Sequence, residues 1–174
     1  MKVIGLIGGM SWESTQTYYR LINQKVNIRL GGLHAANILL HSLNFAPLNR
    51  MQHENRWDEI AALLTDSAIN LETAGADLIL LCTNTMHKVA PAIEEALECP
   101  FLHIVDTTAQ VIKQQGITTV GLLGTNFTME EEFYKDRLRE HGLEVIIPNE
   151  SDRKTVHDVI FNELCLGEIN DNSR

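Results

Sequence analysis

The chain has 174 residues, 44% of them hydrophobic and 21% charged, which is the composition of a soluble globular protein of one ordinary domain or of one and a half small α/β domains. The formal net charge is −9 and no run of Lys and Arg occurs, so neither nucleic acid nor an anionic membrane surface is an expected partner. No stretch reaches the roughly 18 apolar residues that span a bilayer, and no membrane helix is predicted.

The first predicted element is a strand near residue 1. The sequence MKVIGLIGGMSWES has a short apolar run that ends in a glycine turn rather than in a signal-peptide cleavage pattern. Further runs are nearly all aliphatic, which suits strands covered on both faces, as in a parallel sheet. The predicted strands are Lys2–Ile7, Asn37–His41, Asp77–Leu81, Phe101–Val105, Thr119–Leu123 and Glu144–Ile147.

Amphipathic stretches separate these strands, and their apolar residues recur at the spacing of a helix with one buried face. One such stripe is Tyr18, Ile22, Val26 and Leu30, and a second is Trp57, Ile60, Leu63, Leu64 and Leu71. The expected helix C-caps are Gly31, Gly32, Gly75 and Gly142. The alternation of strands and helices predicts an α/β fold built on a doubly wound parallel sheet.

An internal similarity suggests two related units. Residues 4–9 read IGLIGG and residues 120–125 read VGLLGT, each a strand that closes on a glycine turn before a helix. We therefore predict two similar Rossmann-like domains, an N-terminal domain over residues 1–115 that carries Cys82 and a second over residues 116–174. The second stretch is too short for a whole sheet, so this domain is expected to be incomplete.

A candidate reactive cysteine and three polar residues lie in the segment LILLCTNTMHKVA, residues 78–90. Cys82 follows a predicted strand directly, and ligands of open parallel sheets bind beyond the carboxyl ends of strands. Thr83, Asn84 and Thr85 come next, at the first turn of a helix expected near Met86, where backbone N–H groups and hydroxyls suit a carboxylate or phosphate. The same field would lower the pKa of the thiol. Position alone leaves open whether Cys82 is reactive or is a buried residue acting as a small hydrophobe.

Two other turns are expected at the same rim of the sheet. They are Gly8-Gly9-Met10-Ser11 and Gly124-Thr125-Asn126-Phe127-Thr128, each a glycine turn with hydroxyls at a helix start. Neither matches a nucleotide-binding signature, and each alone is typical of a tight turn with an N-cap.

The remaining cysteines and the histidines indicate no metal site. Cys82, Cys99 and Cys165 are odd in number and widely spaced, which argues against a disulfide framework or zinc and for a reducing cytoplasm. Cys99, before a strand, and Cys165, in a predicted helix, are interpreted as structural. His87 could serve as a base for Cys82, whereas His103 is expected inside a strand as a core or rim residue. No HxxxH or HExxH pattern occurs.

The motifs MKVIGLIGGMSWEST, GGLHAANILLHS, LCTNTMHK, FLHIVDTT and GLLGTNFTMEEEFY resemble the aspartate/glutamate racemase superfamily, and in particular broad-specificity amino-acid racemases of the aspartate racemase branch. The resemblance runs from residue 1 to about residue 168. It implies an isomerase that inverts the α-carbon of a small amino acid with no cofactor, neither pyridoxal phosphate nor metal. It also implies two α/β domains with the active site in the cleft between them, two catalytic cysteines and, often, a homodimer.

The resemblance also assigns roles to individual residues. Cys82 matches the catalytic cysteine of the first domain, and Asn84 and Thr85 match residues that hold the substrate carboxylate. The other matched substrate-binding positions are Met10 and Ser11 in the first loop, Thr125 and Thr128 in the GTxxT-like loop, and Gln52 where relatives contact the side-chain carboxylate of the substrate.

The chain departs from the family at its second cysteine. The GCTE-like motif that carries this cysteine does not occur in the 174 residues. The internal repeat agrees, because Cys82 follows Gly8 by 74 residues and the equivalent position after Gly124 falls near 198. The second base is thus expected to be missing from this chain. Two alternatives stay open: a non-catalytic, truncated homologue that binds small acids, and a hydrolase that uses Cys82 and His87. The preferred amino acid is not determined by the sequence.

Overall fold

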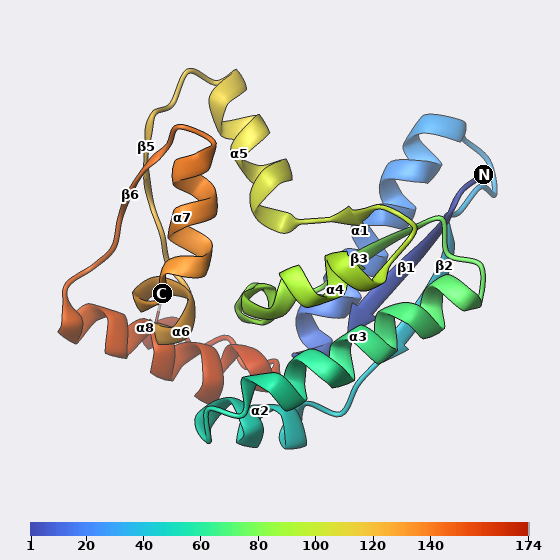
Figure 1. Ribbon diagram of the computed structural model, residues 1–174. Coiled ribbons are helices and arrows are strands. Elements are labelled where there is room, and N and C mark those ends of the chain that lie inside the picture. Colours follow the sequence, from blue (N-terminus) through green and yellow to red (C-terminus); the bar gives the residue numbers. More distant parts are fainter. Residues whose placement is uncertain (174) are drawn as a thin grey trace. The chain divides into compact units, whose positions relative to one another are not determined.

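The computed structural model describes residues 1–173, and contacts divide the chain into two compact units (Figure 1). Unit 1 comprises Met1–Thr83 and Val89–Leu102, and unit 2 comprises Asn84–Lys88 and the chain from His103 onward. The domain boundary at 115/116 stays a prediction. No helix within residues 1–173 is both long and apolar enough to cross a membrane.

Unit 1 is a four-stranded parallel sheet in the order β2-β1-β3-β4. Its strands are β1 (Val3–Gly8), β2 (Asn37–Ser42), β3 (Leu78–Leu81) and β4 (Phe101–Leu102), and its helices are α1 (Trp12–Leu30), α2 (Phe45–His53), α3 (Trp57–Thr73) and α4 (Ala90–Ala96). Strand β1 lies in the centre, where Ile4 is the partner of both Ile38 and Leu78. The parallel α/β fold is thereby confirmed.

The core of unit 1 forms where α3 packs against β1, β2 and β3. Ile60, Leu64 and Ala68 recur every four residues on α3 and are completely buried, as are Leu6 and Ile79 of the sheet. A buried Leu or Ile side chain contributes about 2 kcal/mol to folding, so this face fixes the sheet that carries Cys82 at its edge.

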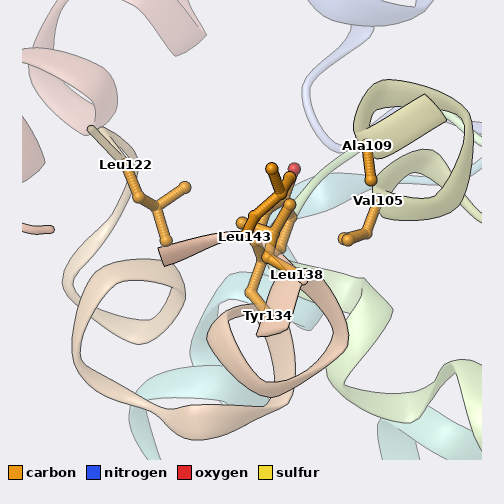
Figure 2. Close-up of a cluster of buried hydrophobic side chains, with 6 residues drawn as sticks. All are labelled: Val105, Ala109, Leu122, Tyr134, Leu138 and Leu143. Carbon is orange, nitrogen blue, oxygen red and sulfur yellow. The ribbon is translucent and has the colours of Figure 1, made fainter. Parts of the chain in front are cut away.

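Unit 2 holds a two-stranded parallel sheet of β5 (Thr119–Gly121) and β6 (Glu144–Ile146). Its helices are α5 (Ile104–Gln114), α6 (Asn126–Glu130), α7 (Glu132–Glu140) and α8 (Glu150–Asn162), with the short 3₁₀ helices η2 (Leu164–Leu166) and η3 (Asp171–Ser173). A further 3₁₀ helix, η1 (Thr85–Val89), lies in unit 2 except for its last residue. Its apolar core consists of Val105, Ala109, Leu122, Tyr134, Leu138 and Leu143, drawn in Figure 2.

Two local predictions are wrong, and both concern the segment from Phe101 to Val105. The strand predicted to reach Val105 ends at Leu102, and His103 is the N-cap of α5 rather than a strand residue, because its Nδ1 atom accepts the backbone N–H of Val105 at 3.2 Å. The helix predicted to start near Met86 is found as the short 3₁₀ helix η1. Cys165 also lies in a helix, as predicted, but in the short 3₁₀ helix η2 beyond the end of α8.

Candidate functional site

The first loop of unit 1, residues Gly8 to Ser11, is held by hydrogen bonds to the side chain of Thr15. The Thr15 hydroxyl accepts the backbone N–H of Gly9 at 2.8 Å and donates to the carbonyl of Ser11 at 3.0 Å. Gly9 has φ +91°, and a Cβ atom there would lie 2.1 Å from the carbonyl oxygen of Leu43, so the position requires glycine. Met10 and Ser11, which are joined by a cis peptide bond, are both buried.

Cys82 lies at the carboxyl end of β3, beside the first loop. Its N–H donates to the carbonyl of Ile7 at 2.9 Å, which extends the pairing of β3 with β1 by one residue. Its own carbonyl accepts the Ser14 hydroxyl at 2.7 Å. Because β1 and β3 are adjacent and parallel, the expected meeting of the first loop and Cys82 at one sheet edge is found in unit 1.

The thiol of Cys82 is completely buried, and burial raises its pKa to about 12. Desolvation disfavours the thiolate, and the 3₁₀ helix that follows has only five residues and so supplies little of the field of a long α-helix. The expectation of a lowered pKa is therefore wrong for this structure. Near neutral pH Cys82 rests as a thiol, which is the form that donates a proton.

The polar triplet after Cys82 is divided between the units. Cys82 and Thr83 belong to unit 1, whereas Asn84 and Thr85 begin the segment Asn84–Lys88 of unit 2. Two contacts bind this segment to the α7 region: the Tyr134 hydroxyl donates to Asn84 Oδ1 at 3.1 Å, and Lys88 pairs with Glu131 at 2.5 Å. The segment is thus fixed by side chains that lie more than forty residues further along the chain.

Three buried threonine hydroxyls form a cluster in unit 2. Thr85 Oγ1 lies 2.9 Å from Thr125 Oγ1 and 3.1 Å from Thr128 Oγ1, and the last two atoms are 3.3 Å apart. Each hydroxyl carries one proton that rotates to suit its partner, so the cluster can turn donors toward an acceptor. The turn at Gly124 follows β5, which lies in the separate two-stranded sheet, so the prediction that it shares one sheet rim with Cys82 is wrong.

Gln52 of α2 is a buried polar residue with an unusual environment. It is only 2% exposed, and neither Nε2 nor Oε1 has a hydrogen-bond partner among residues 1–173. One turn earlier, on the same side of the helix, Asn49 Oδ1 is also buried without a partner in that part of the chain. Buried polar atoms without partners cost free energy, so α2 has amide groups suited to bind a polar ligand.

The two histidines near the segment stabilise the start of α5. His87 Nε2 accepts the backbone N–H of Ile104 at 3.3 Å, and the rings of His87 and His103 lie 4.4 Å apart. Burial, His87 and Arg137 together lower the pKa of His103 to about 3. The Nε2 lone pair of His87 is used by Ile104, so His87 is poorly placed to act as a base for Cys82.

Sequence reasoning did not single out Ser14, Tyr134 or the Asp106 cluster. Asp106 accepts two hydrogen bonds from Arg137, at 2.8 and 2.7 Å, and it lies 2.8 Å from His141 Nε2. These bonds hold the pKa of Asp106 well below its usual range. Residues about thirty positions apart make these contacts, and no local pattern marks them.

Within residues 1–173, no group of three or more His, Cys, Asp or Glu side chains could hold a metal ion.

Known proteins resemble this chain over most of its length. The sequence pattern of the Asp/Glu/Hydantoin racemase family matches residues 7–172. The broad-specificity amino-acid racemase RacX of Bacillus subtilis is 31% identical over 149 residues, which cover 83% of this chain and 63% of RacX. The chain thus spans less than two thirds of the length of that relative.

Two crystal structures are similar in fold and sequence. A candidate Asp/Glu racemase from Yersinia pestis is 55% identical with a TM-score of 0.90, over 99% of this chain and 76% of the other. An aspartate racemase homologue from Pyrococcus horikoshii is 34% identical with a TM-score of 0.82, over 97% and 74% of the two chains. With its matching sequence pattern and its parallel α/β units, the chain belongs to the Asp/Glu/hydantoin racemase family.

Proposed function

We propose that these residues form part of a cofactor-independent amino-acid racemase that inverts the α-carbon of a small amino acid. The observation that carries this proposal is the sequence of Cys82, Thr83, Asn84 and Thr85 at the end of β3. Cys82 and Asn84 are two positions apart, so their Cα atoms are at most about 7 Å apart. A proton donor and carboxylate-binding groups therefore lie close together, and racemases among the similar proteins support the same reaction.

Racemisation requires that a weakly acidic Cα–H bond be broken and that a proton be delivered to the opposite face. One group rarely reaches both faces of a held substrate, so two acid–base groups are needed. We assign one of them to Cys82. Its raised pKa makes it the acid in the resting protein, and the positive charge of a bound α-ammonium group would lower that pKa and make the thiolate accessible.

The charge that develops on the substrate carboxylate needs hydrogen-bond donors. The Asn84 amide and the hydroxyls of Thr85, Thr125 and Thr128 would supply them, as oxyanion donors do in other enzymes. Thr83 follows Cys82 directly and would complete the polar triplet. Met10 and Ser11 would line the substrate from the first loop, and Gln52 would bind the substrate side chain with its buried amide.

The second acid–base group is the open part of this mechanism. A GCTE-like segment does not occur in the 174 residues, and neither Cys99, before β4, nor Cys165, in η2, stands at the end of a strand as Cys82 does. We therefore propose that these residues contribute one of two bases. We also propose that the protein forms a homodimer and is located in the reducing cytoplasm. The cytoplasmic location fits the wide spacing of its cysteines.

A small-acid-binding protein without turnover is the second candidate, because the threonine cluster would bind a carboxylate whether or not Cys82 transfers protons. The hydrolase alternative is less favoured, since His87 Nε2 already accepts a hydrogen bond from Ile104.

The test is to incubate the 174-residue protein with each enantiomer of aspartate and glutamate in D₂O, following deuterium uptake and chiral purity separately. We expect slow deuterium exchange into one enantiomer with little racemisation, and no exchange in Cys82→Ser. Full racemisation would place a second base within these residues. Ligand-induced thermal stabilisation without exchange would favour the acid-binding function, and neither effect would refute both.

A further inference from the structure

Asn84 combines an exposed side chain with an anchored oxygen atom. Its Oδ1 atom accepts a hydrogen bond from the Tyr134 hydroxyl at 3.1 Å. Its Nδ2 atom donates no hydrogen bond to any of residues 1–173. An exposed Asn ordinarily samples several orientations, because rotation about its last side-chain bond has only broad, two-fold preferences. The contact with Tyr134 restricts that rotation.

Tyr134 is itself held firmly. It is 7% exposed and belongs to the core of unit 2, where Figure 2 shows it with Leu138 and Leu143. Burial raises the pKa of Tyr134, so its hydroxyl keeps its proton and remains a donor. A phenol ring packed among leucines cannot follow a moving partner, and it therefore defines where Asn84 Oδ1 lies.

The orientation of the Asn84 amide is set by the Tyr134 hydroxyl, which requires a hydrogen-bond acceptor. If the amide were flipped, its NH₂ group would face the tyrosine oxygen, and the largely buried hydroxyl would have to find another acceptor. Among residues 1–173, Asn84 Oδ1 is the one acceptor that the Tyr134 hydroxyl has. Leaving a buried O–H without an acceptor is unfavourable, so the observed orientation is preferred.

The backbone that carries Asn84 is also fixed. The next residue, Thr85, is tied to Thr125 and Thr128, and Lys88 is paired with Glu131. With both ends of this short segment attached to the same unit, the main remaining freedom of Asn84 is the rotation of its own side chain.

We propose that Tyr134 is a positioning residue, which holds Asn84 Oδ1 so that both Nδ2 hydrogens are presented to the α-carboxylate of the substrate. This inference rests on the proposed function, because it takes Asn84 as a carboxylate donor. Donors that are aligned before the ligand arrives lose less entropy on binding and need no reorganisation as charge develops. Asn84 then offers hydrogen atoms only, which favours an anionic group over a carboxamide.

The experiment is a double-mutant cycle on binding of L- and D-aspartate, measured by calorimetry with the 174-residue protein. The proteins are wild type, Tyr134→Phe, Asn84→Ala and the double variant, with the exposed Tyr19→Phe as a matched control. We expect Tyr134→Phe to weaken binding about 3- to 10-fold, the range of one hydrogen bond. In the Asn84→Ala background the same change should have no further effect, and Tyr19→Phe should bind like wild type.

A second measurement separates this inference from a general loss of structure. The Asn84 side-chain ¹⁵N resonances, assigned by comparison with Asn84→Ala, should move in Tyr134→Phe and not in Tyr19→Phe. Wild-type affinity in Tyr134→Phe, losses that multiply in the double variant, or unmoved resonances would each overturn the inference while leaving the proposed function standing. Wild-type protein that binds neither enantiomer of aspartate, nor of glutamate in the same assay, would refute the proposed function, and the inference with it.

Discussion

Acid should destabilise this protein through His103, because the neutral imidazole is part of the start of α5. His103 Nδ1 accepts the backbone N–H of Val105, and the ring is 3% exposed with His87 beside it. Protonation would remove the acceptor and place a positive charge at the positive end of the helix. The surrounding charges act in both directions, since Arg137 and His141 oppose protonation and Asp106 favours it, yet the pKa falls to about 3.

The magnitude follows from the two pKa values. His103 titrates at 6.5 when unfolded and at about 3 when folded, so between these values the unfolded chain binds one more proton than the folded chain. The stability that the neutral ring supplies is complete above pH 6.5 and is lost as the pH falls toward 3. At about 1.4 kcal/mol per pH unit, acidification from neutrality to about pH 4 should remove roughly 3 kcal/mol of unfolding free energy through this residue alone.

The assay is urea unfolding followed by circular dichroism at several pH values between 7 and 4, with His103→Asn as the matched variant. Asn keeps a neutral acceptor at the N-cap but does not titrate. All other ionisable groups are common to both proteins, so the slope of stability against pH should be smaller in the variant by about 1.4 kcal/mol per unit. Equal slopes, or an imidazole resonance of His103 that titrates near 6.5, would refute the reasoning.

Four further predictions concern the site. Cys82→Ser should abolish racemisation in any form of the protein that racemises, with an unchanged circular dichroism spectrum, because a hydroxyl is a far weaker acid than a thiol; wild-type turnover would remove Cys82 from the mechanism. Asn84→Ala should raise the transition-state free energy derived from kcat/KM by roughly 2–4 kcal/mol, because a carboxylate donor is lost. An unchanged kcat/KM would mean that Asn84 has only a structural role. Alkylation of Cys82, followed by peptide mass spectrometry, should rise about tenfold per pH unit toward its pKa of about 12, and a plateau near pH 9 would contradict the effect of burial. Gly9→Ala should destabilise the fold by at least about 2 kcal/mol more than Gly116→Ala, since both have positive φ but only at Gly9 would the Cβ atom meet the backbone of Leu43; equal losses of unfolding free energy would show that the clash relaxes.

The sequence determined the elements that depend on local pattern. The runs Val3–Gly8 and Leu78–Leu81 are aliphatic because both faces of a central parallel strand are covered, and that pattern predicted β1 and β3 closely. It also placed Cys82 at a strand end, next to the loop that follows β1. The family could be inferred for the same reason, because its motifs are short contiguous segments at such strand ends.

Only the tertiary structure decided how those residues behave. Asn84 accepts the hydroxyl of Tyr134, fifty positions away, and His103 caps a helix within a segment whose pattern resembled a strand. The pKa of Cys82 rises because the folded chain removes water from the thiol, an effect that no neighbouring residue in the sequence announces. Local hydrogen-bonding preferences and apolar periodicity are encoded by nearby residues, whereas desolvation and contacts between distant segments exist only once the chain has folded.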